Sequence, residues 1–188
     1  MNIRDAKTED IEHINNIHNQ AIHEKFKVAY LTPWTKENCF EWFKEHNTKE
    51  YPIYVAESDN SVIGFVYINP YRPGRTALKQ TAEISYFIDA KYRGKGIGKK
   101  LIEYMESQCY KLGIKTLFAI IIDNNEASIK LIERCGYKKW GHLPKIAIFD
   151  TIEVGHLYYG KRIIPSNAWE APQIYEAHCV LPPLLPLQ

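Results

Sequence analysis

The sequence predicts an α/β domain of the α+β kind, in which a mixed, mostly antiparallel central sheet is flanked by helices and contains one βαβ crossover. Two kinds of segment occur along the chain. In some, apolar and polar residues alternate as in strands; in others, apolar residues recur at three- and four-residue spacing, as in helices. One strand-type segment runs directly into a glycine-rich turn and a helix, and a further apolar strand comes next, which is the pattern of a parallel crossover. A length of 188 residues is enough for one domain with a sizeable core.

Two helices are expected near the start of the chain. Residues 8–24 repeat isoleucine and alanine at helical spacing, and Thr8 is a plausible N-cap. A second, shorter helix is expected from Thr35, because apolar aromatic residues then recur on one side, at Phe40 and Phe43.

The next part of the chain is typical of strands. Residues 51–70 contain two runs of β-branched and aromatic residues, divided at residues 58–61 by the composition of a tight turn, which predicts a hairpin. Residues 81–89 alternate again. This alternation places Glu83, Ser85 and Phe87 on one face of a strand and Ile84, Tyr86 and Ile88 on the other.

The second half of the chain is expected to alternate helices and strands. A helix from Gly98 should stop at Gly113, and residues 115–122 should form a buried strand. Asn125 should cap another helix, which ends at Gly136. Two last strands are expected around residues 137–141 and 153–161.

Composition narrows the class of protein. The chain carries 24 basic and 22 acidic side chains, and this balance argues against an obligate nucleic-acid binder. Residues 1–14 lack the apolar core of a secretory signal, and no window approaches the ~18 apolar residues that span a bilayer. The four cysteines have neither the spacing of a zinc site nor that of a disulfide scaffold. We therefore expect a soluble, cytoplasmic protein without a metal centre and without a membrane or nucleic-acid partner.

A glycine-rich segment, "YRGKGIGKK" at residues 92–100, opens the helix that follows the strand of residues 81–89. Unpaired N–H groups at a helix N-terminus bind anions readily, and glycine lets the backbone approach them closely. The spacing G-x-G-x-G differs from the dinucleotide-binding G-x-G-x-x-G, and the phosphate-loop ending G-K-[ST] is absent. We expect a phosphate-bearing ligand of another kind. The alternative is a plain turn whose lysines only face water.

A longer pattern surrounds this segment. Residues 93–98 read Arg-Gly-Lys-Gly-Ile-Gly, a strand precedes them, and a strand and an Asn-x-x-Ser helix at residues 125–128 follow. This order resembles the GNAT superfamily of acetyl-CoA-dependent N-acetyltransferases, whose signature is Arg/Gln-x-x-Gly-x-Gly/Ala. The resemblance covers about residues 2–162. It implies a GNAT acetyltransferase domain at residues 1–164, followed by a proline-rich tail at residues 165–188.

The resemblance implies a set of residues that bind acetyl-CoA. The backbone of the glycine turn would cradle the coenzyme A diphosphate, the edge of the preceding strand would pair with the pantetheine amides, and the asparagine of the later helix would contact the cofactor as well as cap its helix. The residues so implied are Tyr86, Phe87, Ile88, Arg93, Gly94, Lys95, Gly96, Ile97, Gly98, Lys99 and Asn125.

Four stretches carry a closer resemblance: "IHNQAI", "YPIYVAE", "YRPGRTALKQTAEISYFI" and "GYKKWGHLPKIAIF". They are similar to the phosphinothricin acetyltransferase branch, which acetylates small amino acids and analogues such as methionine sulfoximine. The chain departs from this branch where Gly74 adds one residue to a loop, and where Ile152 and Glu153 replace a tryptophan and an aspartate. The half that would bind the acceptor has therefore diverged more than the half that would bind the cofactor.

The branch also implies roles in the chemistry. An α-amine with a pKa of ~8 is mostly protonated at neutral pH, so a base must remove a proton before the amine attacks the thioester. Glu83 occupies the position of the branch's general base. Arg72 and Arg75 would hold an anionic group of the acceptor as bidentate guanidinium donors, or, equally, they are two basic residues of a solvated loop. Phe149 would form a wall of the acceptor pocket or, equally, pack in the core.

No residue is required as an acid for the leaving thiol, whose reference pKa is ~8.5. Many GNAT enzymes use a tyrosine in the helix after the asparagine, but the matching residue here is Ile132. The remaining possible acids, which are more typical of structural positions, are Tyr137, His142, His156 and Tyr158.

Three functional hypotheses remain open from the sequence. The first is transfer of an acetyl group to the amine of a small amino acid or analogue. The second is acetylation of a protein N-terminus or another amine, and the third is a non-catalytic acyl-CoA sensor. Relatives in this branch often dimerise, so a homodimer is possible.

Overall fold

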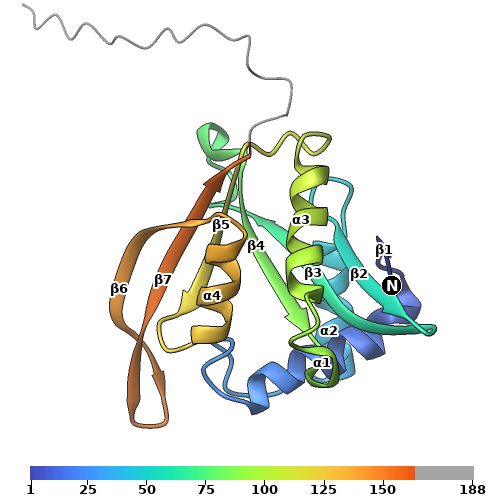
Figure 1. The fold of residues 1–188 in the computed structure, drawn as a ribbon, viewed down its shortest axis with the longest axis horizontal. Helices are drawn as coiled ribbons and strands as arrows, with labels where there is room; N and C mark the ends of the chain where they lie inside the picture. Colours follow the sequence, from blue (N-terminus) through green and yellow to red (C-terminus); the bar gives the residue numbers. More distant parts are fainter. Residues whose placement is uncertain (164–188) are drawn as a thin grey trace, which may run out of the picture.

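The computed structural model describes residues 1–163, which form one seven-stranded sheet with helices on both faces (Figure 1). The strand order is β1-β2-β3-β4-β5-β7-β6. All neighbouring strands are antiparallel except β4 and β5, which are parallel and joined through α3. The predicted fold class, a mostly antiparallel sheet with one βαβ crossover, is confirmed. The predicted tail at residues 165–188 lies outside the described residues.

The elements have the following bounds. The strands are β1 (Asn2–Asp5), β2 (Ile53–Ser58), β3 (Ser61–Pro70), β4 (Thr81–Ile88), β5 (Thr116–Ile122), β6 (Lys138–Phe149) and β7 (Ile152–Arg162). The helices are α1 (Ile11–His23), α2 (Lys36–His46), α3 (Ile97–Cys109) and α4 (Glu126–Arg134), with short 3-10 turns η1 (Thr8–Asp10), η2 (Thr76–Leu78) and η3 (Ala90–Tyr92).

Helices α1 and α2 cover one face of the sheet. Their apolar residues, among them Ile14, Ile17 and Phe43, pack in one buried cluster with Ile53 of β2 and Phe65 of β3. The same face of β4 carries Glu83, Ser85 and Phe87, because these residues lie opposite Asn69, Tyr67 and Phe65 in register. This is the face on which the acceptor site is expected.

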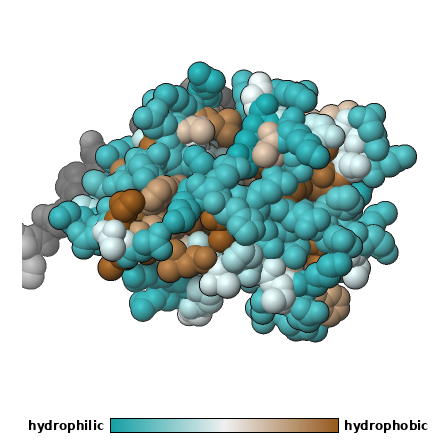
Figure 2. All heavy atoms as spheres, turned by 90° about the horizontal axis from the view of Figure 1, so that it is seen from below, coloured by the Kyte–Doolittle hydropathy of each residue, from teal (hydrophilic) through white to brown (hydrophobic). Residues whose placement is uncertain are grey.

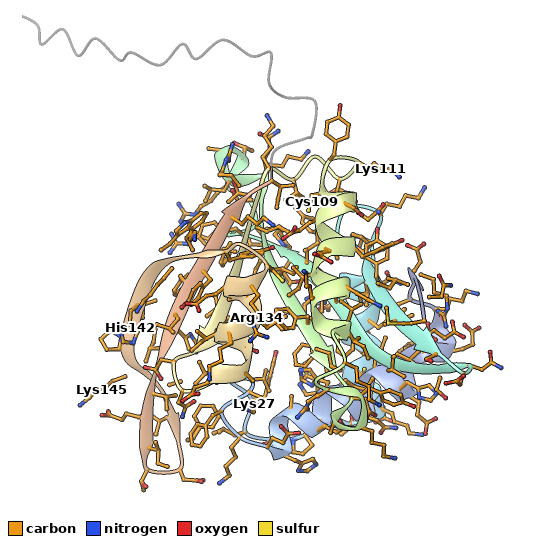
Figure 3. All side chains as sticks on the ribbon, in the orientation of Figure 1. Lys27, Cys109, Lys111, Arg134, His142 and Lys145 are labelled. Atoms are coloured by element: carbon orange, nitrogen blue, oxygen red, sulfur yellow. The ribbon has the colours of Figure 1, made fainter. Side chains whose placement is uncertain are left out.

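Helices α3 and α4 cover the other face, where the larger core cluster lies (Figure 1). Leu101 and Met105 of α3 are fully buried there, in one cluster with Leu117 and Ala119 of β5. The three described cysteines are free and buried. Cys109 lies at the end of α3 that is remote from the glycine turn (Figure 3).

The structure corrects two details at the start of the chain. Strand β1 was not predicted, because four residues are too few to show an alternation. Thr8 is not an N-cap but the first residue of η1, and Asp10 accepts the backbone N–H of Lys7 at 2.8 Å instead. The predicted helix start at Thr35 is confirmed, since this residue is the N-cap of α2 and its side chain accepts the backbone N–H of Asn38.

The last two strands are longer than expected. β6 and β7 pair from Lys138 to Phe149, beyond the predicted residues 137–141, and the pairing is interrupted by register shifts after Lys139 and after Leu143. These irregularities hide the strand from a periodicity argument, because a bulge reverses which residues face the core. The β2–β3 hairpin was predicted correctly, and Asp59 and Asn60 of its turn have positive φ.

The surface seen from the end that carries the glycine turn is mainly hydrophilic, with scattered apolar groups (Figure 2). Within residues 1–163, no helix combines the length and the apolar composition needed to cross a bilayer. The same residues contain no cluster of three or more histidine, cysteine or acidic side chains arranged to hold a metal ion.

Candidate active site

The candidate site begins where β4 and β5 separate. Their parallel pairing covers only Thr81, Ala82 and Glu83 on β4, whereas the pairing of β4 with β3 continues to Ile88. Figure 1 shows the two strands diverging beyond their paired ends. On the β5 side, the backbone groups of residues 84–88 therefore lack a strand partner and can pair with an extended ligand. Tyr86, Phe87 and Ile88, predicted to bind the pantetheine amides, lie on this open edge and are partly exposed.

The glycine turn has the conformation of an anion cradle. Gly94 and Gly96 have φ of +77° and +79°, and no atom lies within 4 Å of the position that a Cβ would take at either residue. Gly96 is the N-cap of α3, and no side chain caps this helix. The first N–H groups of α3 are therefore free to bind an anion, and binding of the coenzyme A diphosphate there stays a prediction.

Two other residues of the signature, Ile97 and Gly98, also pack within the protein. Ile97 is buried in the core, and a Cβ at Gly98 would lie 2.7 Å from Leu131 Cδ2 and 3.2 Å from Ile88 Cδ1. Glycine is therefore needed at position 98 for the packing of α3 against α4 and β4, not to admit the ligand. Both residues can contribute to an anion site only through their backbone N–H groups.

The charged side chains of the turn are partly engaged. The Arg93 guanidinium donates from one nitrogen to both carboxylate oxygens of Glu24 at 2.6 Å, and from Nε to the Ile88 carbonyl oxygen at 3.2 Å. Lys95 lies over the Tyr92 ring at 5.0 Å, and Lys99 pairs with an exposed Glu103 at 3.6 Å. Arg93 thus ties the turn to the end of α1, while both lysines remain near solvent.

The link between α1 and the turn was missed by the sequence analysis. Besides the Arg93–Glu24 pair, Gln20 accepts the backbone N–H of Ala90 at 2.8 Å and donates to Asp89 Oδ2 at 3.2 Å. Residues about 70 positions apart in the chain make these contacts, and no local pattern signals them. α1 therefore fixes the position of the glycine turn.

Asn125 stands on the opposite side of the separation between the strands. It is 4% exposed and caps α4 by accepting the backbone N–H of Ser128 at 3.4 Å, as predicted. Lys27 Nζ, in the segment after α1, lies 3.5 Å from Asn125 Oδ1, and Figure 3 shows this lysine below α4. The Tyr86 hydroxyl donates to the Ser128 carbonyl oxygen at 3.4 Å, which joins β4 to α4. A contact of Asn125 with the cofactor stays a prediction.

Glu83 lies in the middle of a row of three side chains. Its register partners are Asn69 on β3 and Phe118 on β5, so all three residues share the face covered by α1 and α2. The row stands at the last paired position of β4 and β5. Burial raises the pKa of the Glu83 carboxyl above its ordinary value. A half-buried carboxyl with a raised pKa next to a strand opening is suited to act as a general base.

Arg72 and Arg75 lie in the loop before β4, at the end of the strand opposite the cofactor turn. Both are exposed. The Arg72 guanidinium lies over the Tyr71 ring at 5.8 Å, and Tyr71 contacts Phe118 edge to face at 4.9 Å. This chain of contacts connects Arg72 to the row that contains Glu83.

Phe149 is not brought next to Glu83. It is 3% exposed and packs with Ile122, Val154 and Phe26, whose ring centroid lies 4.9 Å away. Ile122 is four positions beyond Phe118 on β5, which corresponds to about 13 Å along a strand. Phe149 also lines a hollow of about 190 Å³ formed mainly by the segment after α1. Phe149 therefore packs in a core cluster, and its role as a wall of the acceptor pocket stays a prediction.

The four possible acids lie in different parts of the structure, and two of them share the face of the sheet that carries Glu83. Tyr158 and His156 lie on the Glu83 face, and Tyr158 stacks on Phe118 at 6.2 Å. Tyr137 is 1% exposed in the core beneath α3, so it is structural. His142, which Figure 3 labels, lies on β6, and its Nε2 atom is 3.1 Å from Asp123 Oδ2.

An aromatic group lies next to the open edge of β4 and was also missed. The His18 imidazole is 2% exposed and stacks on Trp34 at 3.9 Å, with Phe87 at 5.0 Å and Tyr30 at 5.5 Å. Burial lowers the pKa of His18 to about 4, so the ring is neutral at physiological pH. Only the packing of α1 against β4 brings these residues together.

Comparison with known proteins agrees with this geometry. Residues 19–137 match the acetyltransferase (GNAT) family model. YwnH of Bacillus subtilis (strain 168), which carries a provisional name as a phosphinothricin acetyltransferase, is 38% identical over 151 residues, covering 80% of this chain and 91% of the relative. The L-methionine sulfoximine/L-methionine sulfone acetyltransferase of Pseudomonas paraeruginosa (strain DSM 24068 / PA7) is 30% identical over 145 residues, 77% of this chain and 84% of the relative.

A solved structure extends the comparison to the cofactor. The phosphinothricin acetyltransferase (Pat) from Sinorhizobium meliloti, in complex with AcCoA, superposes with a TM-score of 0.81 at 25% identity, covering 86% of this chain and 88% of that structure. The family match spans more than half of the chain and includes the glycine turn, the separated strands and the capping asparagine. The chain therefore belongs to the GNAT family of acetyltransferases, enzymes that take their acetyl group from acetyl-CoA.

Proposed function

We propose that this protein transfers the acetyl group of acetyl-CoA to the primary amine of a small amino acid or close analogue, of the phosphinothricin and methionine sulfoximine kind. The observation that carries the proposal is Glu83, a half-buried carboxyl with a raised pKa at the point where β4 and β5 part. The similarity to relatives named for phosphinothricin and methionine sulfoximine supports the acceptor class.

The chain's residues fit the cofactor in two places. The N–H groups from Gly94 to Lys99 would hold the diphosphate, since Gly94 and Gly96 leave open space and α3 has no side-chain cap. The open edge at Tyr86, Phe87 and Ile88 would hydrogen-bond the pantetheine amides as an added strand. When bound, acetyl-CoA supplies a thioester carbonyl carbon to the attacking amine.

Glu83 performs the proton transfer in this proposal. An ammonium group with a pKa of ~8 must lose a proton before its nitrogen can attack, and a carboxyl whose pKa is raised by burial is a stronger base than one in water. The proton moves from nitrogen to the Glu83 carboxylate, directly or through one water molecule. The thiol leaves without a dedicated acid, because its pKa is near ~8.5.

The acceptor's own anionic group would be held by the loop before β4. Arg72 and Arg75 are exposed, and Arg72 is connected to the Glu83 row through Tyr71 and Phe118. A guanidinium binds a carboxylate or phosphinate with two parallel hydrogen bonds, which orients the ligand as well as attracting it.

The test is release of free coenzyme A from acetyl-CoA with methionine sulfoximine, methionine sulfone and phosphinothricin as acceptors. Glu83→Gln should lower kcat by about 100- to 10,000-fold, the usual contribution of a general base, with acetyl-CoA affinity retained. Glu45→Gln, an exposed glutamate of α2, is the matched control and should leave kcat unchanged. If wild type acetylates a free peptide N-terminus and none of the three analogues, the acceptor class is wrong. If it binds acetyl-CoA and acetylates no amine, the protein is a sensor.

Two further parts of the proposal concern the setting of the enzyme. A cytoplasmic location is supported by three free, buried cysteines, which suit a reducing compartment. A homodimer is supported by the edge strand β6 and the start of β7, where Ile146, Ile148 and Ile152 are more than half exposed. Light scattering on the purified chain would distinguish a dimer from a monomer.

A further inference from the structure

Asn69 carries a buried oxygen that has no partner. It is the last residue but one of β3, directly opposite Glu83 in the antiparallel register. Its Oδ1 atom is buried and accepts no hydrogen bond from any residue at positions 1–163. A buried carbonyl oxygen without a donor is destabilising, and natural proteins rarely keep one unless a ligand or water satisfies it.

The neighbours of Asn69 explain why the protein itself supplies no donor. Directly opposed residues on antiparallel strands have Cβ atoms about 4.5–5.5 Å apart, so the side chains of Asn69 and Glu83 start from neighbouring positions on the same face of the sheet. An ionised carboxylate only accepts hydrogen bonds. Two acceptors thus stand side by side at the place where β4 and β5 separate. A group with several N–H donors is what such a pair lacks.

We propose that Asn69 is an amine-binding residue, whose Oδ1 accepts one N–H of the acceptor's amino group while Glu83 accepts another. The inference rests on the proposed N-acetyltransferase function and adds a second contact to the reacting nitrogen. A primary ammonium has three N–H donors, so it can satisfy both oxygens and keep a third bond for water or backbone. An alcohol or a thiol has one donor and cannot.

The contact also orients the nitrogen during proton transfer. As the N–H bond to Glu83 breaks and an O–H bond forms on the carboxyl, the electron pair of the broken bond stays on nitrogen. The N–H held by Asn69 stops the amine from turning, so this pair keeps a fixed direction. Orientation of a reacting atom is a large component of enzymatic rate enhancement, which gives a buried amide beside the base a function.

The experiment compares three variants with wild type. Asn69→Leu keeps the approximate size of the side chain and removes the oxygen, and Asn69→Asp keeps an oxygen at the same position. Asn2→Leu, on the exposed edge strand β1, is the matched control. Steady-state kinetics with methionine sulfoximine give the acceptor KM and kcat. Calorimetry gives the acceptor dissociation constant in the presence of coenzyme A, which is a readout independent of turnover.

Loss of a hydrogen bond to a charged group predicts that Asn69→Leu weakens acceptor binding about 10- to 100-fold, with acetyl-CoA affinity unchanged. Asn69→Asp should stay within about threefold of wild type in acceptor affinity at pH 8.5, because its oxygen still accepts the N–H. In wild type, N,N-dimethylation of the acceptor should weaken its binding much more than it does in Asn69→Leu, since the single N–H donor that remains cannot satisfy both oxygens.

Three results would overturn the inference. Asn69→Leu could bind the acceptor as well as wild type does, or it could weaken acetyl-CoA instead. Asn69→Asp could lose as much affinity as Asn69→Leu, which would mean that the amide nitrogen donates to Glu83 rather than the oxygen accepting from the amine. The proposed function can fail while the inference about Asn69 stands. This is the case if wild type acetylates a peptide N-terminus and none of the analogues. The same comparison of variants is then run with the peptide, because any primary amine presents the same donors. A wild type that acetylates no amine overturns both.

Discussion

Replacing Gly98 by alanine perturbs the packing between α3, α4 and β4 at the base of the cofactor site. Position 98 is the second residue of α3 and has an ordinary helical backbone, so alanine is conformationally allowed. Its Cβ would nevertheless lie 2.7 Å from Leu131 Cδ2 and 3.2 Å from Ile88 Cδ1. Ordinary contacts begin at 3.4 Å, so Leu131 has to retreat by the difference from 2.7 Å, about 0.7 Å.

The magnitude follows from two opposing effects. Overpacking of this kind costs about 1–3 kcal/mol, and alanine returns about 1 kcal/mol of helix propensity relative to glycine. The net loss is therefore about 0–2 kcal/mol, which lowers Tm by up to about 8 °C at about 2–4 °C per kcal/mol for a domain of this size. Because Leu131 and Ile88 border the strand opening, acetyl-CoA affinity should fall with stability.

Thermal unfolding of Gly98→Ala, Leu131→Val and the double variant provides the assay. Valine lacks the Cδ2 atom that meets the new Cβ, so the double variant should be no less stable than Leu131→Val alone. This non-additivity is expected of residues in direct contact. If Gly98→Ala is as stable as wild type and the two substitutions are additive, the packing explanation for this glycine is refuted, and the close approach of a ligand becomes its explanation.

The remaining predictions concern protonation and the cofactor turn. Because burial raises the pKa of Glu83 and the base must be ionised, kcat/KM should fall as pH decreases through a pKa above 4.5, and the residual activity of Glu83→Gln should lack this limb. Burial lowers the pKa of His18 to about 4, so His18 takes up a proton at a higher pH in the unfolded state than in the folded state. The free energy of unfolding, measured by urea denaturation, should therefore fall by about 2 kcal/mol from pH 7 to about pH 4.5. His18→Phe should lack this fall. Arg93→Ala should weaken acetyl-CoA binding by up to about fivefold, since a partly exposed ion pair contributes up to about 1 kcal/mol, and Glu24→Ala should do the same if Arg93 acts by tying the turn to α1.

Controls distinguish these effects from general damage. His23→Phe, at the exposed end of α1, should keep the acid sensitivity of the wild type. Lys44→Ala removes an exposed ion pair with Glu41 on α2 and should leave acetyl-CoA binding unchanged. If Glu24→Ala strengthens acetyl-CoA binding while Arg93→Ala weakens it, Arg93 contacts the phosphates directly and the tie to α1 is secondary.

Local patterns predicted most of the fold and indicated where the cofactor is expected to bind. The periodicity of α1, α3 and β5, the cap at Asn125 and the glycines of the turn are properties of short segments, and each is set by sterics and hydrogen bonding within a few residues. β1 and the full length of β6 escaped, because the first is too short for an alternation and the second contains two register shifts.

The acceptor half was less accessible from the sequence. Glu83 was identified by resemblance, but its partners Asn69 and Phe118 lie 14 and 35 positions away in the chain, and only the pairing of three strands puts them in one row. Phe149 shows the opposite case. Its place in a motif suggested a pocket wall, and packing against Ile122 and Phe26 puts it in a core cluster.

By itself, the sequence indicated the chemical type of the site: a glycine-rich helix start that is expected to bind phosphate, and a carboxylate on the strand that leads to it. Tertiary structure alone decided which side chains meet there. It paired Arg93 with Glu24, placed His18 among aromatic rings, and left Asn69 Oδ1 without a donor beside Glu83. The physical reason is range: helix capping and backbone conformation depend on neighbouring residues, whereas strand register and the approach of α1 to β4 depend on how the whole chain buries its apolar surface.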